Sequence, residues 1–258
     1  MSTRWKIAIA LAAALAWTGC GGGSPGPGDD GGVEDGADAA DGTDGADAAG
    51  DDGGGDGGAD GGDDIGGRPK SPLYGQILFN EVLIDGTAEG DPNGDGDTSQ
   101  PFEDQFVELV NVHGSDLNLE SFTLIEEDFA EGKPRHTFPA GAILPAGHAL
   151  VVFGGGDAPP ATATAEFFTA NADDPPGLSF GLHLSVPADA VWLLDAQGGV
   201  VDRLCYGGSS ADCSLPAAED ASLTRAPDLS GDFTPHDAAA GSGGEAFSPG
   251  TRLDGTPF

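Results

Sequence analysis

The sequence is poor in positive charge, in cysteine and in long apolar runs. It has 258 residues, with 9 Lys and Arg against 44 Asp and Glu, a formal net charge of -35 at pH 7 and only 3 Cys. A chain of this charge repels nucleic acid and anionic membrane surfaces, which excludes a nucleic-acid-binding role and leaves polycations and metal ions as ionic partners. No apolar run reaches the roughly 20 residues that a membrane-spanning helix needs.

Residues 1–19 are typical of a lipoprotein signal peptide. Arg4 and Lys6 precede an apolar run at 7–17, and "WTGC" then resembles a bacterial lipobox, in which the cysteine is acylated. The resemblance implies lipidation of Cys20 and export to the bacterial envelope. Gly21 follows that cysteine, and by the rule known for enteric bacteria it favours the outer membrane or cell surface. The alternative is a secreted protein without an anchor.

Residues 20–67 are nearly free of large apolar side chains. Between residues 29 and 64 there are 14 acids and no base, set among Gly and Ala. Such a segment buries too little apolar surface to offset its ordering entropy, and its like charges repel. The composition therefore predicts a disordered acidic tether over 20–67, followed by a domain over 68–258.

Short apolar runs separated by Gly, Pro, Asp and Asn follow the acidic segment. Runs of strand length, rich in β-branched or aromatic residues, predict an all-β domain, either a sandwich or a barrel. Two junctions, "PAG" at 145–147 and "AQGG" at 196–199, predict hairpin-type turns. The predicted strands are Gln76–Ile84, Gln105–Val112, Ser121–Glu127, His148–Gly154, Ala165–Ala170, Ala190–Ala196 and Val200–Gly207.

Cys205 and Cys213 remain once Cys20 is assigned to the anchor. In an oxidising compartment an even pair this close in sequence predicts a disulfide. The alternative is two free thiols. A zinc site needs more ligands than these two residues supply.

The order of several motifs resembles the bacterial lamin-tail domain. These are "ILFNEVLID", "DQFVELVN", "DLNLESFTL", "HTFPAGAILPAGHALVVFG", "SLTRAPDLSGDFTPH" and "FSPGTRLDG", which run from about Gln76 to the C-terminus. The resemblance implies an immunoglobulin-like β-sandwich of a kind found on exported bacterial proteins, alone or beside hydrolase domains. The family is not itself known as an enzyme.

Two predicted neighbouring strands carry apolar residues for the core. In the first strand, Ile77 and Phe79 would face the core and, one register on, so would Val82 and Ile84. In the second, the expected core residues are Phe106, Leu109 and Val110.

Glu81 and Glu108 lie within those same apolar strands. Acids placed there cost free energy unless they are paired, and Arg225 is one of only 9 basic residues in the chain. We therefore expect Arg225 to form an ion pair with one of them. The alternative is a catalytic pair of carboxylates, although no nucleophile or base lies nearby in sequence.

The stretch "DPNGDGDTSQPF" from residue 91 partly matches an EF-hand calcium loop. Asp91, Asn93 and Asp95 occupy positions 1, 3 and 5, and Gly96 supplies the turn at position 6. Position 12 is Phe102, so the closing ligand must come from elsewhere.

Asp97, Glu103 or Asp104 could complete the ligand set. Calcium accepts six to eight oxygens in a flexible geometry, so a site outside the EF-hand fold is chemically reasonable. The alternative is a solvated turn in which Asp, Asn and Gly serve only turn chemistry.

Recognised enzyme motifs are missing. The sequence contains no H-E-x-x-H, G-x-S-x-G, S-x-x-K or Walker motif, and its five His residues are scattered. The sequence therefore favours a non-catalytic surface lipoprotein that binds an envelope protein or polysaccharide, or that serves adhesion or envelope structure. The alternative is a secreted hydrolase or an accessory subunit of one.

Overall fold

The computed structural model describes residues 67–84, 90–126, 134–172, 181–208, 213–218 and 220–258. The predicted signal peptide, Cys20 and most of the predicted tether lie outside these residues. No helix among the described residues is long and apolar enough to cross a membrane. The strands are β1 (Ile77–Leu83), β2 (Phe106–Asn111), β3 (Leu117–Asn118), β4 (Thr123–Glu126), β5 (Pro134–Thr137), β6 (Ile143–Leu144), β7 (Ala149–Phe153), β8 (Ala165–Thr169), β9 (Asp189–Leu194), β10 (Val200–Tyr206), β11 (Leu223–Ala226) and β12 (Asp232–Pro235), and the short helices include α1 (Pro101–Asp104) and η2 (His236–Ala238).

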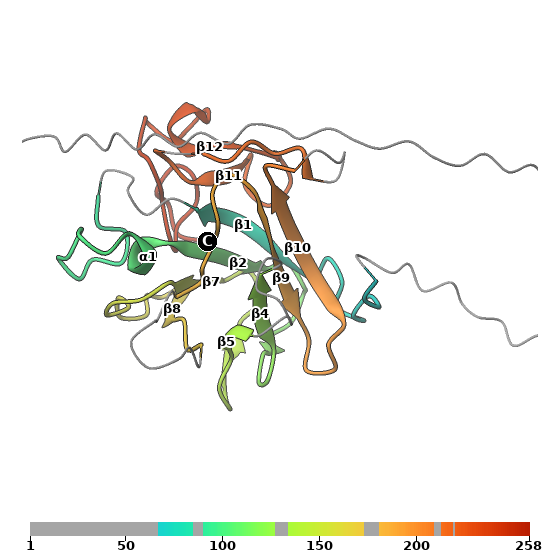
Figure 1. The fold of residues 1–258 in the computed structure, drawn as a ribbon. Helices are drawn as coiled ribbons and strands as arrows, with labels where there is room; N and C mark the ends of the chain where they lie inside the picture. The colour runs from blue at the N-terminus through green and yellow to red at the C-terminus, as the bar shows by residue number, and fades with distance from the viewer. Residues whose placement is uncertain (1–66, 85–89, 127–133, 173–180, 209–212, 219) are drawn as a thin grey trace, which may run out of the picture. The chain divides into compact units, whose positions relative to one another are not determined.

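Two sheets form a β-sandwich, as predicted (Figure 1). A six-stranded sheet has the order β12-β11-β1-β2-β7-β8, and a four-stranded sheet has the order β10-β9-β4-β5. A separate two-stranded sheet pairs β3 with β6. β7 and β8 are parallel, and the other paired strands are antiparallel. The main core lies between the two larger sheets, where Phe79 and Leu109 meet Leu124 and Leu193.

A break in the register of β1 brings two sets of its residues to the same core. Ile77 and Phe79 face the core before the break, and Val82 and Ile84 face it after the break. The shift against β2 falls between Phe79 and Glu81, so one residue is extra on the β1 side. The predicted change of register is confirmed.

The second set of predicted core residues was only partly right. Leu109 packs in the core between the sheets, whereas Phe106 and Val110 pack on the opposite face of β2. That outer face is also buried, so the strand "FVELVN" is apolar on both sides and lacks the alternation that would have distinguished its two faces.

The C-terminal segment, residues 222–258, covers the outer face of the six-stranded sheet. Phe247 packs against Phe106 and Phe153, and Phe258 packs in the cluster that contains Val110. The last residue is drawn over β2 and β7 in Figure 1. The same segment contributes β11 and β12 to the edge of the sheet, beside β1. A strand pair and a covering loop thus come from one stretch of chain.

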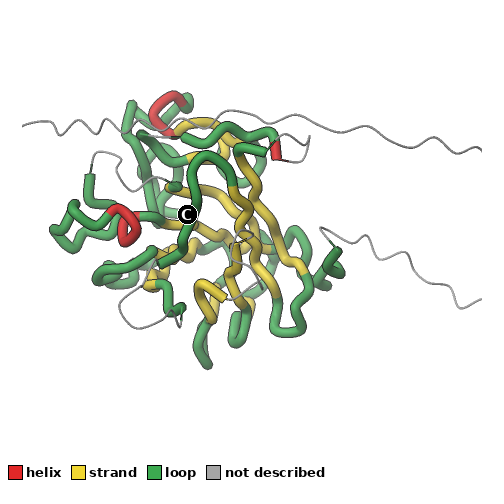
Figure 2. The backbone as a smooth tube through the Cα atoms, in the orientation of Figure 1, coloured by secondary structure: helices red, strands yellow, loops and turns green. Residues whose placement is uncertain are grey.

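The seven predicted strands all occur, shortened by one or two residues at most ends. The additional strands have two to four residues each, such as "LN" and "PRHT", which is too short for an alternation pattern to show. Figure 2 shows how much of the chain between the strands is loop.

The two predicted turns have different outcomes. The "AQGG" turn joins β9 to β10 as a hairpin, with Gly198 at φ 82°. The "PAG" turn also forms, with Gly147 at φ 77°, but β6 before it and β7 after it belong to different sheets. It is therefore a corner between sheets and not a hairpin.

Candidate functional site

The loop at residues 91–97 is held by its own acidic side chains. Asp91 accepts hydrogen bonds from the backbone N–H groups of Asp95 (3.1 Å) and Gly96 (2.7 Å). Asn93 Oδ1 accepts from the Asp95 N–H (3.0 Å), and Asp95 accepts from the Asp97 N–H (2.8 Å). Each alternate side chain therefore fixes the backbone that follows it, which is the turn chemistry of Asp and Asn.

The loop leads into α1, which ends at Asp104. This side chain has 0% of its surface exposed, and neither of its carboxylate oxygens has a hydrogen-bond partner. Burial, together with the negative charges of Asp91 and Asp95 and smaller effects from Glu103 and Asp97, raises the pKa of Asp104 to about 6. A buried carboxylate surrounded by acids and lacking donors is energetically costly.

Three consecutive glycines after β7 support this loop. A Cβ at Gly154 would collide with the Phe102 carbonyl oxygen, and one at Gly155 would lie 2.6 Å from Glu103 Cγ. A Cβ at Gly156 would collide with the Asp95 carboxylate, and its φ of 66° also favours glycine. The "GGG" sequence thus allows the loop and α1 to approach the end of β7 closely.

The calcium interpretation stays a prediction at this point. In the ranges that the structure describes, no three His, Cys, Asp or Glu side chains already converge as metal ligands. Asp91, Asn93 and Asp95 share one short loop, and Asp104 lies close enough to feel the charges of Asp91 and Asp95. Asp97 is exposed and accepts hydrogen bonds from the N–H and hydroxyl of Ser99, which lower its pKa.

Glu81 and Glu108 form a second acidic site, sealed beneath the C-terminal segment. They are opposite each other in the β1–β2 pair, and both have 0% of their surface exposed. Glu108 accepts hydrogen bonds from Asn80 Nδ2 (2.9 Å) and the Gly250 N–H (2.7 Å). Burial raises the pKa of Glu108 well above its usual value, and the neighbouring charge of Glu81 adds to the rise.

Glu81 accepts hydrogen bonds from two serines, one of which also contacts a histidine. Ser222 Oγ donates to Oε1 (2.6 Å), and the Ser248 N–H donates to the same oxygen (2.9 Å). Ser248 Oγ lies 3.0 Å from Oε2 and 2.8 Å from Nε2 of the buried His236, whose Nδ1 lies 2.8 Å from the Glu245 carbonyl oxygen. Burial raises the pKa of Glu81, and His236 opposes this rise.

The donor and acceptor geometry of this chain of groups is compatible with two arrangements of its hydrogens. An imidazolium can donate to the Glu245 carbonyl and to Ser248, whose hydroxyl then donates to the Glu81 carboxylate. Alternatively, a protonated Glu81 donates to Ser248, whose hydroxyl donates to a neutral His236. Each arrangement satisfies every polar atom of the chain, so the cluster has a structural explanation without a substrate.

Arg225 does not form the predicted ion pair, and this prediction is corrected. Its Nε donates to the Phe79 carbonyl oxygen (2.9 Å), and its Nη1 donates to the Gly231 carbonyl oxygen (3.0 Å). The guanidinium also lies over the Phe233 ring, 4.5 Å from its centre. Its charge acts on Asp202, a half-buried acid of β10 that accepts a hydrogen bond from the Phe79 N–H (2.8 Å).

Apart from Asn80, the partners of the glutamates could not be found from the sequence, because they are small and lie far along the chain. Ser222, Ser248 and Gly250 are more than 140 positions from the glutamates that they satisfy. Two of these contacts use backbone N–H groups, which leave no residue-type signal in a sequence. Nothing in the sequence distinguished these serines from the others.

The structure joins Cys205 and Cys213 by a disulfide, with their Cα atoms 4.7 Å apart. Cys205 belongs to β10, and both cysteines pack with Trp192 in a small buried cluster. The Arg203 guanidinium lies 4.5 Å from the centre of the Trp192 ring. The bridge therefore fixes the chain after β10 against the outer face of the four-stranded sheet.

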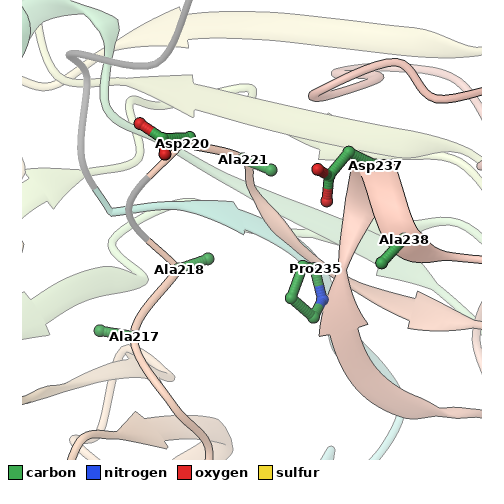
Figure 3. A pocket seen from close by; sticks show the side chains of 7 residues that line it. All are labelled: Ala217, Ala218, Asp220, Ala221, Pro235, Asp237 and Ala238. Carbon is green, nitrogen blue, oxygen red and sulfur yellow. The ribbon is translucent and has the colours of Figure 1, made fainter.

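A pocket of about 440 Å³ lies between residues 217, 218, 220 and 221 on one side and the end of β12 with η2 on the other (Figure 3). Alanine side chains and Pro235 form much of its lining, and Asp220 and Asp237 are its two charged residues. Figure 3 shows these two carboxylates on separate segments without converging on a common point. The pocket thus lacks the grouped polar atoms that would define a binding or catalytic centre.

The pattern of the Lamin Tail Domain family matches residues 70–208, more than half of the chain. The chain belongs to the lamin tail domain family. No curated protein matches the chain significantly.

The matched part of this lamin tail domain protein includes the 91–104 loop and both buried glutamates. It ends before Ser222, so the resemblance of "SLTRAPDLSGDFTPH" and "FSPGTRLDG" to the family lies outside the match. Those residues nevertheless supply β11, β12 and the groups that satisfy the glutamates. The acidic pair is therefore a feature of the matched domain completed by the C-terminal segment.

Proposed function

We propose that this chain is an exported surface lipoprotein, anchored through Cys20, whose lamin tail domain has a binding or structural role in the bacterial envelope and no catalytic role. The leader at residues 1–19 and the lipobox-like "WTGC" support the anchor. The acidic composition of residues 20–67 supports a tether between anchor and domain. Its charge has the same sign as anionic lipid, which favours a domain held away from the membrane surface.

The proposal of a non-catalytic role rests on one observation, which is that the ionisable groups nearest to a catalytic arrangement are buried. Glu81, Glu108 and His236 each have 0% of their surface exposed. Ser248 completes the grouping of carboxylate, hydroxyl and imidazole that hydrolases use, but the C-terminal segment covers it and the contacts satisfy one another. A substrate would have to displace that segment to reach these atoms, which supports a structural role for the cluster.

The anchor is tested by fractionating cells that express the natural protein or Cys20→Ser. We expect the natural protein in the membrane fraction and in the detergent phase, and the variant in the soluble fraction. The double variant Cys205→Ser/Cys213→Ser is the matched control, because it removes the two other cysteines and leaves Cys20 in place. Equal partitioning of the natural protein and Cys20→Ser would contradict the anchor.

The role of the domain is tested by cross-linking on intact cells, followed by identification of the captured partner. An envelope protein or polysaccharide is expected for a binding or structural role. Capture of an exported hydrolase, with enzyme activity that depends on this protein, would instead favour an accessory subunit.

A further inference from the structure

One buried carboxylate in the lamin tail domain lacks the partners that the other buried acids have. Glu81, Glu108 and Asp195 each accept hydrogen bonds from N–H or hydroxyl groups. Asp104 is equally inaccessible, with 0% of its surface exposed, yet both of its oxygens are unpartnered. The adjacent Gln105 makes three buried hydrogen bonds, so the backbone at this point is fixed and Asp104 has little freedom to turn outward.

The charges around Asp104 show what kind of partner would satisfy it. Asp91 and Asp95 act on it most strongly, followed by Glu103 and Asp97, and all four are negative. Adding an uncharged donor would leave this repulsion in place. A bound cation would remove both the repulsion and the unsatisfied carboxylate.

The loop beside Asp104 presents further side-chain oxygens. Asp91 and Asn93 already hold the backbone at Asp95, which places three oxygen-bearing side chains around one turn. Gly94 and Gly96 have φ values of 74° and 89°, which allow the turn. A carboxylate has about four lone-pair positions, so the oxygens that cap the backbone keep capacity for a metal.

We propose that Asp91, Asn93, Asp95 and the buried Asp104 bind a calcium ion. Asp104 takes the closing role that the Glu at position 12 has in an EF-hand, and α1 carries it to the loop from two residues further along. The Asp97 backbone carbonyl holds position 7 of the pattern, where EF-hands also use a carbonyl oxygen.

Closing the site requires rotation of loop side chains, because three carboxylates do not yet converge among the described residues. Asp95 is exposed and Asp91 is half-buried, and their hydrogen bonds are to residues of the loop itself. Their rotation therefore leaves the core unchanged. An all-oxygen set that adapts its geometry favours Ca²⁺ over Mg²⁺, which demands a near-ideal octahedron.

The test is a calcium titration of the full-length protein after treatment with EDTA, followed by calorimetry and by thermal unfolding. We expect one saturable site with Kd of the order of 10⁻⁴ to 10⁻³ M, as in extracellular modules. At ten times Kd, binding should raise Tm by about 3–6 °C. Mg²⁺ at the same concentration should raise it less.

The variant Asp104→Asn tests whether Asp104 is a calcium ligand or only a structural residue. Removing its charge relieves the repulsion, so the variant should melt at a higher temperature than the natural protein in EDTA, and calcium should no longer raise its Tm. Asp91→Asn/Asp95→Asn is a second variant at more exposed positions, where folding is less at risk, and it should lose the calcium response as well.

Asp232→Asn/Asp237→Asn is the matched control, because it removes two exposed acids outside the loop and thereby corrects for weak binding by the acidic chain as a whole. It should keep the calcium response. An equal calcium response in the loop variants and the control, or no heat and no rise in Tm at several millimolar Ca²⁺, would overturn the proposal.

Discussion

Replacing Glu108 by Gln should change how the stability of the protein depends on pH. Glu108 is fully buried opposite Glu81, and these two features raise its pKa well above its usual value of 4.5. The folded protein therefore keeps a proton that the unfolded chain releases. This stabilisation is complete below about pH 4.5 and is lost as pH rises toward the folded-state pKa.

The size of the effect follows from the number of protons retained. One proton held by the folded state and released by the unfolded state lowers the free energy of unfolding by about 1.4 kcal/mol for each unit of pH. Because Glu108 is fully buried, this value needs no reduction for solvent screening. Glu108→Gln introduces an uncharged side chain of the same shape. It should therefore remove the contribution of Glu108 to the change of unfolding free energy with pH.

The assay is urea unfolding at several pH values between 5 and 8, followed by tryptophan fluorescence. Glu120→Gln, at an exposed position, is the matched control for loss of a carboxylate. The amide introduced by Glu108→Gln has a single oxygen and can accept from only one of the two donors, so the variant should also lose about 1–3 kcal/mol at pH 5. A pH slope that is identical in the natural protein and Glu108→Gln would contradict a raised pKa of Glu108 in the folded protein.

Two further predictions concern other buried groups. Burial lowers the pKa of His136 to about 4, so His136 contributes stability above pH 6.5 that is lost as pH falls toward 4. In the same unfolding assay, the free energy of unfolding of His136→Phe should fall by about 3 kcal/mol less over this pH range than that of the natural protein. An unchanged acid dependence would contradict this prediction. The Cys205–Cys213 disulfide closes a loop with a sequence separation of 8, and its reduction should lower the free energy of unfolding by about 2–3 kcal/mol in the chain-entropy account. The variant Cys205→Ser/Cys213→Ser should behave like the reduced protein. Equal stability before and after reduction would contradict the prediction.

The long strands could be predicted from the sequence because each carries enough apolar residues to show its length. The break in β1 could also be predicted, since the apolar spacing changes between Phe79 and Val82. The faces of β2 could not, because Phe106 and Val110 are buried by a C-terminal segment more than 100 residues away. Burial on both faces removes the alternation on which such an assignment depends.

In the candidate sites, too, features set by neighbouring residues could be predicted from the sequence, and features set by distant residues could not. The oxygens at 91, 93 and 95 follow a spacing that the sequence displays directly. The isolation of Asp104 depends on burial, which the sequence does not display. The partner of Glu81 was mispredicted as Arg225 because charge was the only available signal, whereas the fold uses two serines and a histidine.

We propose that a lipid on Cys20 holds this lamin tail domain protein at the envelope. The most direct measurement is mass spectrometry of the N-terminal peptide of the protein isolated from the membrane fraction. We expect the mature chain to begin at Cys20 and to carry the added mass of a diacylglyceryl group, with a further acyl chain on its amino group where the host supplies one. A mature chain that begins at another residue, or an unmodified Cys20, would contradict the claim.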